Sequence, residues 1–222
     1  MHQSVSAKRC FVAFALAMAV LLSPAVGFAQ LPIQNPVPIP TPLPIPNPTV
    51  TPTSSVLGSA SAVSATVLGF TTVLGGTGTL SGVNDARDAS MTTGSLPAIL
   101  TGETLSAATI SWPDQVYSEA SLSNLNMAVA GVGIRASSVM AQASQVLGAA
   151  GSGSSAFNNL VVNGVPINVT GAPNQIVSVP GGIVTINEQT ISPTGAAVVN
   201  ALHVAVTGVA DLVVASASAG IS

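Results

Sequence analysis

His203 is the residue of this chain best suited to acid–base chemistry. It is the only histidine after residue 29, and Asp211 or Glu188 could orient it in a Ser-His-Asp hydrolase. No G-x-S-x-G elbow presents a nucleophilic serine. A structural zinc site would need more imidazole or thiolate ligands than one histidine supplies. We therefore assign no catalytic residue and expect His203 to form hydrogen bonds within or beside a β-sheet.

A second group of polar residues lies in one short turn. Asn84, Asp85 and Asp88 gather three oxygen-bearing side chains within five residues, next to a glycine-containing stretch. Calcium binds six to eight such oxygens, so this turn is the candidate metal site of the chain. Arg87 lies inside the group and offsets its charge, which favours the alternative of a solvated turn. No other cofactor is expected.

The segment Gly131–Ala136 matches the G-x-G-x-x-A pattern of dinucleotide-binding loops. Such a loop requires a helix after it and an acidic side chain about 20 residues further on. Residues 150–160 contain no acidic residue. We therefore interpret Gly131–Ala136 as a tight hairpin turn.

The N-terminus has the pattern of a secretory signal peptide. Lys8 and Arg9 precede the uncharged run Cys10–Leu22, and Gly27-Phe28-Ala29 supplies small residues for cleavage near Ala29. We expect residues 1–29 to be removed and the protein to be secreted, or held at the surface of a bacterial cell. The only cysteine would be lost with this peptide, so stability must come from apolar burial and backbone hydrogen bonds.

Residues 30–54 form a proline-rich segment in which proline recurs at nearly every second position from Pro32 to Pro52. Proline fixes its own φ and pushes the preceding residue to extended geometry. This pattern predicts a polyproline II linker, or stalk, ahead of the folded part.

Charge is scarce throughout the chain, at 5% of residues. Beyond the predicted signal peptide, Arg87 and Arg135 face seven acidic residues, and there is no lysine. Nucleic-acid backbones require clusters of lysine and arginine, so we expect no nucleic-acid partner. The apolar C-terminal stretch is interrupted by Asn200, His203 and Asp211, so we expect no transmembrane segment in the mature chain.

Residues 55–222 carry the pattern of a single β-rich domain. Short runs rich in Val, Ile and Thr alternate with Gly, Asn and Pro turns, of which Asn163-Gly164 is the clearest hairpin signal. A helix over Ser137–Ala150 is an alternative for one run. The pattern predicts an all-β, antiparallel β-sandwich-like domain of about 9–11 strands. The expected strands are Val63–Leu74, Thr104–Trp112, Val116–Val129, Ile134–Ala143, Leu160–Val162 with Val165–Val169, Ile176–Val179, Ile183–Ile191, Val198–Val206 and Leu212–Ala217.

Several short motifs, in order, resemble the choice-of-anchor P family of bacterial secreted and surface proteins. They are YSEASLSNL at Tyr117–Leu125, LVVNG at Leu160–Gly164, GAPNQ at Gly171–Gln175, INEQ at Ile186–Gln189, VNALHV at 199–204 and GVADLVVASA at Gly208–Ala217. The resemblance spans 56–221 and implies an exported domain, with no catalytic residue to transfer. Because no LPXTG-type or PEP-type sorting tail follows, we expect retention without that family's anchor.

These observations favour a non-enzymatic structural or adhesive protein of the bacterial cell surface or extracellular matrix. The alternatives are a lectin-like or calcium-dependent binding module and a secreted hydrolase built around His203. The expected partners are cell-envelope or matrix components, or further copies of the chain that pair through β-sheet edges. We expect either the run Leu212–Ala217 or the extended N-terminal segment to add to a neighbour's sheet in this way.

Overall fold

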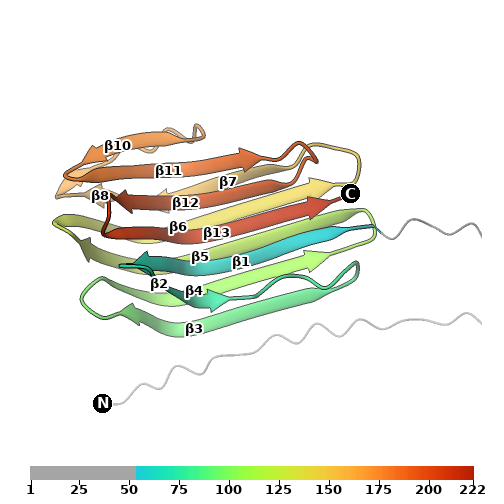
Figure 1. The fold of residues 1–222 in the computed structure, drawn as a ribbon, viewed down its shortest axis with the longest axis horizontal. Helices are drawn as coiled ribbons and strands as arrows, with labels where there is room; N and C mark the ends of the chain where they lie inside the picture. Colours follow the sequence, from blue (N-terminus) through green and yellow to red (C-terminus); the bar gives the residue numbers. More distant parts are fainter. Residues whose placement is uncertain (1–53) are drawn as a thin grey trace, which may run out of the picture. The chain divides into compact units, whose positions relative to one another are not determined.

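A computed structural model describes residues 54–222, which build two antiparallel β-sheets packed face to face (Figure 1). The predicted all-β sandwich is confirmed, and no helix occurs among the described residues. The predicted signal peptide and all but the last residue of the predicted linker lie outside the described residues.

One sheet, sheet A, has six strands in the order β10-β11-β12-β13-β1-β2. Every neighbouring pair is antiparallel. The strands are β1 (Val56–Val67), β2 (Phe70–Gly76), β10 (Gln175–Val179), β11 (Gly182–Ile191), β12 (Ala197–Val206) and β13 (Ala210–Ile221).

The other sheet, sheet B, has the order β3-β4-β5-β6-β8-β9, with β7 paired to another stretch of β6. Its strands are β3 (Ala86–Leu96), β4 (Leu100–Ser111), β5 (Gln115–Val129), β6 (Val132–Val146), β7 (Ser152–Asn158), β8 (Val161–Val162) and β9 (Val165–Pro166). The long hairpin β5–β6 forms the centre of this sheet, and alternate side chains of both strands enter the core.

The described residues hold thirteen strands rather than the predicted number of about 9–11. The expected strand Val63–Leu74 is two strands, because Leu68 and Gly69 both adopt positive φ and close a hairpin between β1 and β2. The strands β3 and β7 were not predicted. Their sequences are dominated by Ser, Thr, Gly and Ala, and tertiary pairing outweighs their low intrinsic strand propensity.

The alternative helix over Ser137–Ala150 is wrong, since most of this stretch belongs to the strand β6. Both predicted hairpin turns are confirmed. Asn163 and Gly164 adopt positive φ between β8 and β9. Ala130 and Gly131 do the same between β5 and β6, so the first glycine of the G-x-G-x-x-A segment closes a two-residue turn and the rest of the segment, from Val132 on, belongs to β6.

The expectation that Leu212–Ala217 offers a free edge is also wrong. These residues belong to β13, which is paired on one side to β12 and on the other to β1. Leu212 and Val214 are fully buried. The C-terminal strand is therefore a central strand of sheet A, and self-association would have to use another part of the sheet.

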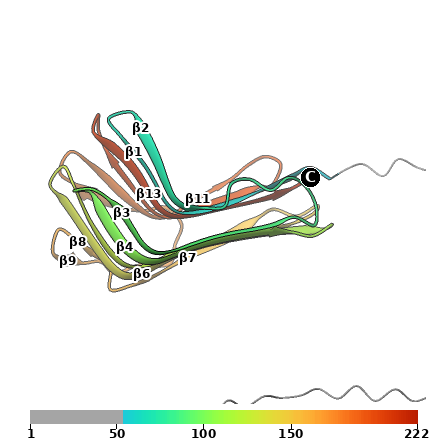
Figure 2. The same cartoon turned by 90° about the horizontal axis from the view of Figure 1, so that it is seen from below.

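Both sheets bend sharply at mid-length, in the same sense, so that sheet A nests inside sheet B (Figure 2). In sheet A the bend follows one row of residues that the regular pairing skips, and in this row Asn187, Ala215 and Gly75 have positive φ. In sheet B, Thr104 and Asn124 have positive φ at the corresponding bend. We call these two rows the crease.

The burial pattern changes phase at the crease, and this identifies the concave side of each sheet. In sheet A two successive residues point into the core, at Ala62-Val63, Ala201-Leu202 and Val214-Ala215. In sheet B two successive residues instead face solvent, as at Ser123-Asn124. An extra side chain fits on the convex side of a bend. The outer face of sheet A is therefore concave, in agreement with Figure 2.

Candidate functional site

The concave outer face of sheet A carries a cluster of polar side chains close to the crease. On β12 two successive residues, Ala201 and Leu202, point into the core. Asn200 before them and His203 after them both face outward. Pairing places Glu188 of β11 opposite Asn200 and Ser216 of β13 on the other side of Asn200. Three adjacent strands thus bring together side chains that are far apart in the sequence.

His203 lies at the centre of this cluster, between two carboxylates. Its Nδ1 is 3.0 Å from Oε1 of Glu188, and its Nε2 is 3.1 Å from Oδ2 of Asp211. A neutral imidazole has one N–H and can donate only one of these hydrogen bonds, whereas an imidazolium donates both. The geometry therefore matches a positively charged His203 that bridges β11 and β13 across its own strand.

The pKa of His203 is affected by opposing influences. Partial burial, the largest single one, lowers the pKa because it disfavours the charged ring. The hydrogen bonds to Glu188 and Asp211 and the negative charges of both carboxylates raise it, and together they outweigh burial. The pKa of His203 consequently lies above its ordinary value of 6.5.

The cluster continues from Glu188 toward β13 through two further hydrogen bonds. The Asn200 amide donates to Oε2 of Glu188 at 2.6 Å, and the Ser216 hydroxyl donates to the amide oxygen of Asn200 at 2.7 Å. Both Glu188 oxygens therefore accept hydrogen bonds, and the side chain is fixed in one orientation. We call Glu188, Asn200, His203, Asp211 and Ser216 the His203 cluster.

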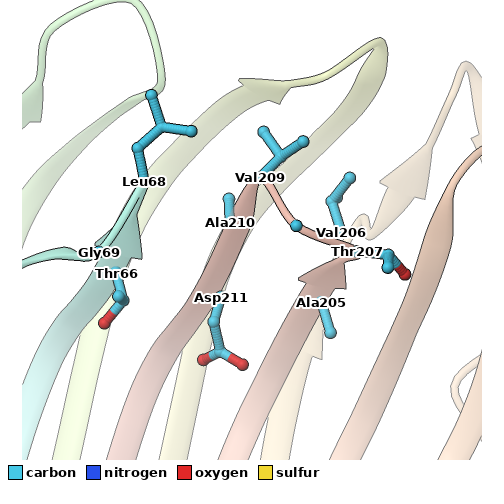
Figure 3. Close-up of a pocket in the computed structure, with 10 residues that line it drawn as sticks. Thr66, Leu68, Gly69, Ala205, Val206, Thr207, Val209, Ala210 and Asp211 are labelled. Atoms are coloured by element: carbon cyan, nitrogen blue, oxygen red, sulfur yellow. The ribbon is translucent and has the colours of Figure 1, made fainter.

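An open depression of about 460 Å³ lies next to the cluster, at the end of the sheet where β1, β12 and β13 turn (Figure 3). Asp211 contributes to its wall together with Thr66 and Ala205, which flank Asp211 in the same row of the sheet. The glycines and aliphatic side chains of the adjoining turns complete the wall. The Asp211 carboxylate is thus shared between the His203 cluster and this depression.

The arrangement around His203 suits binding better than acid–base catalysis. A catalytic base needs one ring nitrogen free to accept a proton, and here both nitrogens contact carboxylates. Ser216, the serine of the cluster, donates to Asn200 rather than to the imidazole. The exposed edge of the cluster offers carboxylate, amide and hydroxyl groups that can exchange hydrogen bonds with a polar ligand.

The candidate calcium residues lie in the turn before β3 and in β3 itself, and Asp85 is already bonded to its neighbours. Both the Ser81 backbone N–H and the Ser81 hydroxyl donate to Oδ2 of Asp85 at 2.8 Å, and Arg87 donates to the same oxygen at 3.1 Å. Asn84 precedes Asp85 with positive φ, whereas Asp88 lies within the strand β3. Within residues 54–222 no group of three or more His, Cys, Asp or Glu is placed to hold a metal ion. Calcium binding at Asn84, Asp85 and Asp88 stays a prediction.

The contacts of Asp85 explain its acidity. Its pKa is lowered to about 2, first by the backbone hydrogen bond from Ser81, then by the Ser81 hydroxyl and Arg87. Asp85 thus remains ionised over the whole physiological range and holds the turn that leads into β3. This role is structural, in line with the alternative of a solvated turn.

A second polar group lies on the convex outer face of sheet B, on the opposite sheet from His203. The Tyr117 hydroxyl donates to Oε2 of Glu119 at 2.7 Å, and the Gln142 amide donates to the same oxygen at 3.0 Å. Partial burial raises the pKa of Tyr117 to about 12, with the hydrogen bond to Glu119 and its charge adding to the effect. The Glu119 carboxylate thus links β5 to β6 across this face.

The sequence identified part of the His203 cluster. It pointed to His203 and to both acidic residues that contact it, Glu188 and Asp211. It missed Asn200 and Ser216, because strand pairing rather than sequence spacing brings them together. The available signal was the alternation within β12, where Asn200 and His203 interrupt a run of Ala, Val and Leu.

No protein-family model, no curated protein and no solved structure matches the chain. The described part of the chain also contains no helix long and apolar enough to cross a membrane.

Proposed function

We propose that the chain is an exported, non-enzymatic structural or adhesive protein of the bacterial cell surface or extracellular matrix. The motif order that resembles the choice-of-anchor P family supports this assignment, as do the predicted signal peptide and proline-rich linker. The observation that carries the proposal is the bonding of His203. The histidine best suited to catalysis is held by Glu188 and Asp211, which leaves no ring nitrogen free.

The outer faces of the sandwich have the chemistry of an adhesive surface rather than of a reaction centre. Hydroxyl groups pair across neighbouring strands, as in Ser59 with Ser218 at 2.9 Å and Thr66 with Thr71 at 2.8 Å. Such pairs add stability to the sheet and make these stretches of its outer face polar without adding charge. A surface of this kind can contact neutral wall or matrix polymers with little electrostatic repulsion.

A binding module for neutral glycans is the second candidate, and the His203 cluster favours it. Carboxylate and amide groups on a concave sheet face, next to an open depression, can form paired hydrogen bonds with vicinal sugar hydroxyls. The Asp211 side chain is 60% exposed and is the group of the cluster most accessible to a ligand. Calcium could assist such binding through Asn84, Asp85 and Asp88.

Fractionation of the producing bacterium, with antibodies against the folded part, tests the structural role. We expect the protein in the wall or matrix fraction, and recovery only from the cytoplasm would overturn the proposal.

A glycan array with the wild type and Asp211→Asn tests the second candidate. Specific glycan binding that Asp211→Asn abolishes would favour the binding module. A hydrolytic activity lost in His203→Ala would overturn the non-enzymatic assignment.

A further inference from the structure

Sheet A ends in two strands whose outer edges are unpaired. The strand β10 closes one edge and β2 the other (Figure 1). Among the described residues, no backbone hydrogen bond joins the outer side of either strand to another segment. Each edge therefore presents free N–H and C=O groups, which are a template for a further strand.

The two edges match each other in position and direction. Pairing across the sheet places β10 residues 175–179 and β2 residues 70–74 in the same five rows, from Gln175 with Leu74 to Val179 with Phe70. The number of strands is even, so β2 and β10 run in opposite directions. If a second copy lies beside the first, displaced by the width of sheet A, its β10 meets β2 of the first copy. The two strands are then antiparallel, and hydrogen-bonded and non-hydrogen-bonded residue pairs alternate as they do within the sheet.

The side chains of the two edges also match. Val73 and Ile176 share one row of the concave outer face, and they are 53% and 62% exposed. Two rows further on, Thr71 and Ser178 share the next row that faces outward, and both are exposed hydroxyl residues. Juxtaposed edges would pair the valine with the isoleucine and the threonine with the serine. Both are favourable cross-strand combinations.

These edges lack the residues that usually prevent edge pairing. Neither β2 nor β10 contains a charged residue or a proline. The edges of sheet B differ, because β3 carries Arg87 and Asp88 and β9 ends in Pro166, which has no N–H to donate. A charge or a proline thus guards β3 and β9 of sheet B, whereas β7 of that sheet and both ends of sheet A contain neither.

We propose that a second copy of this chain docks edge to edge on sheet A, with β2 of one copy pairing to β10 of the next. The contact is heterologous, since one edge meets a different edge, and each added copy exposes a fresh β2 or β10. The product is an open, head-to-tail assembly with a continuous sheet A, which strand twist makes helical. This inference rests on the proposed structural role and gives that role a mechanism.

Analytical ultracentrifugation of variants altered at the two edges tests the proposal. The full chain is expressed in a bacterium, and the protein that accumulates is purified, whether or not its N-terminus has been processed. The wild type should show assemblies that grow with concentration. Val73→Lys and Ile176→Lys each place a charge on one edge at an exposed position, and each should weaken association on the order of tenfold or more. Val198→Lys is the matched control, because Val198 is exposed on the same face but lies on a central strand.

A mixture of the two edge variants gives the sharpest result. The Val73→Lys chain retains an intact β10, and the Ile176→Lys chain retains an intact β2. Mixed together, they should form a one-to-one dimer and nothing larger, while each alone stays largely monomeric. Assemblies beyond the dimer in the mixture would overturn the proposal, as would a wild type that remains monomeric at every concentration. An equal loss of association in Val198→Lys would overturn it as well.

The two proposals can fail separately. A wild type that is retained at the cell surface yet stays monomeric in solution would overturn edge pairing and leave the structural role intact. A wild type that assembles through these edges but is recovered only from the cytoplasm would overturn the structural role alone.

Discussion

Replacing Glu188 with glutamine tests whether His203 is held as an imidazolium between two carboxylates. The substitution keeps the shape of the side chain and an oxygen that can accept the hydrogen bond from Asn200. It removes the negative charge 3.0 Å from Nδ1 of His203. A loss of stability that depends on the charge of His203 should follow.

The exposure of each partner sets the size of this loss. Hydrogen bonds to charged groups contribute about 1.5–3 kcal/mol when buried, whereas exposed ion pairs contribute about 0.2–1 kcal/mol. The side chains of His203 and Glu188 are 22% and 29% exposed, and that of Asp211 is 60% exposed. We therefore expect Glu188→Gln to lower the free energy of unfolding by about 1 kcal/mol, and Asp211→Asn by about 0.3 kcal/mol.

The sign of the pH dependence follows from the raised pKa of His203. The folded state binds the proton more tightly than the unfolded chain, so this contribution is fully present below the ordinary pKa of 6.5. It is lost as the pH rises through the pKa of the folded state. The stability difference between wild type and Glu188→Gln should accordingly be largest near pH 6 and shrink toward pH 9.

Urea unfolding followed by circular dichroism at these two pH values measures the difference. His203→Gln serves as the control, because it removes the titrating group. In chains that carry His203→Gln, the effect of Glu188→Gln on the free energy of unfolding should no longer depend on pH. A difference between wild type and Glu188→Gln that stays the same at both pH values would refute the imidazolium bridge.

Three further outcomes follow from the structure. Gly153→Ala should lower the free energy of unfolding by about 1–3 kcal/mol in urea titrations, because its Cβ would clash with Cγ2 of Val199 and with the backbone oxygen of Gln142. Ultraviolet titration of Tyr117, the only tyrosine, should give a midpoint near pH 12, and Glu119→Gln should lower that midpoint. Thr104→Asn should raise the unfolding free energy by about 0.5–1 kcal/mol, since a β-branched residue is strained at φ 49° and asparagine tolerates this conformation better. An unchanged or lower value would show that Thr104 is not strained.

Local patterns in the sequence predict the class of fold and most of its strands. Alternating Val-rich runs give β12, and Asn163-Gly164 gives the turn between β8 and β9. The strands β3 and β7 lack this pattern, because they lie at or near sheet edges and their exposed faces carry small polar residues. Their place in the fold depends on the partner strand, which no local window contains.

The position of a strand within its sheet is harder to predict than its existence. The composition of the apolar run Leu212–Ala217 is compatible with an aggregation-prone edge strand and equally with a central strand. The pairing with both β1 and β12 decides the matter, and it joins residues up to 165 positions apart, as in Val56 with Ile221. Whether a strand lies at an edge is therefore decided by the topology of the sheet. The absence of charged residues and prolines from β2 and β10 indicates a pairing surface only because both strands are edge strands.

The crease connects the sequence, the shape and the candidate site. A strict two-residue alternation would place either Asn200 or His203 in the core, since they are an odd number of positions apart on β12. The inward pair Ala201-Leu202 shifts the phase, so that both side chains face the concave side. The same shift occurs at Val214-Ala215, which leaves Ser216 outward beside Asn200. The bend that curves sheet A is thus also what assembles the His203 cluster on its concave face.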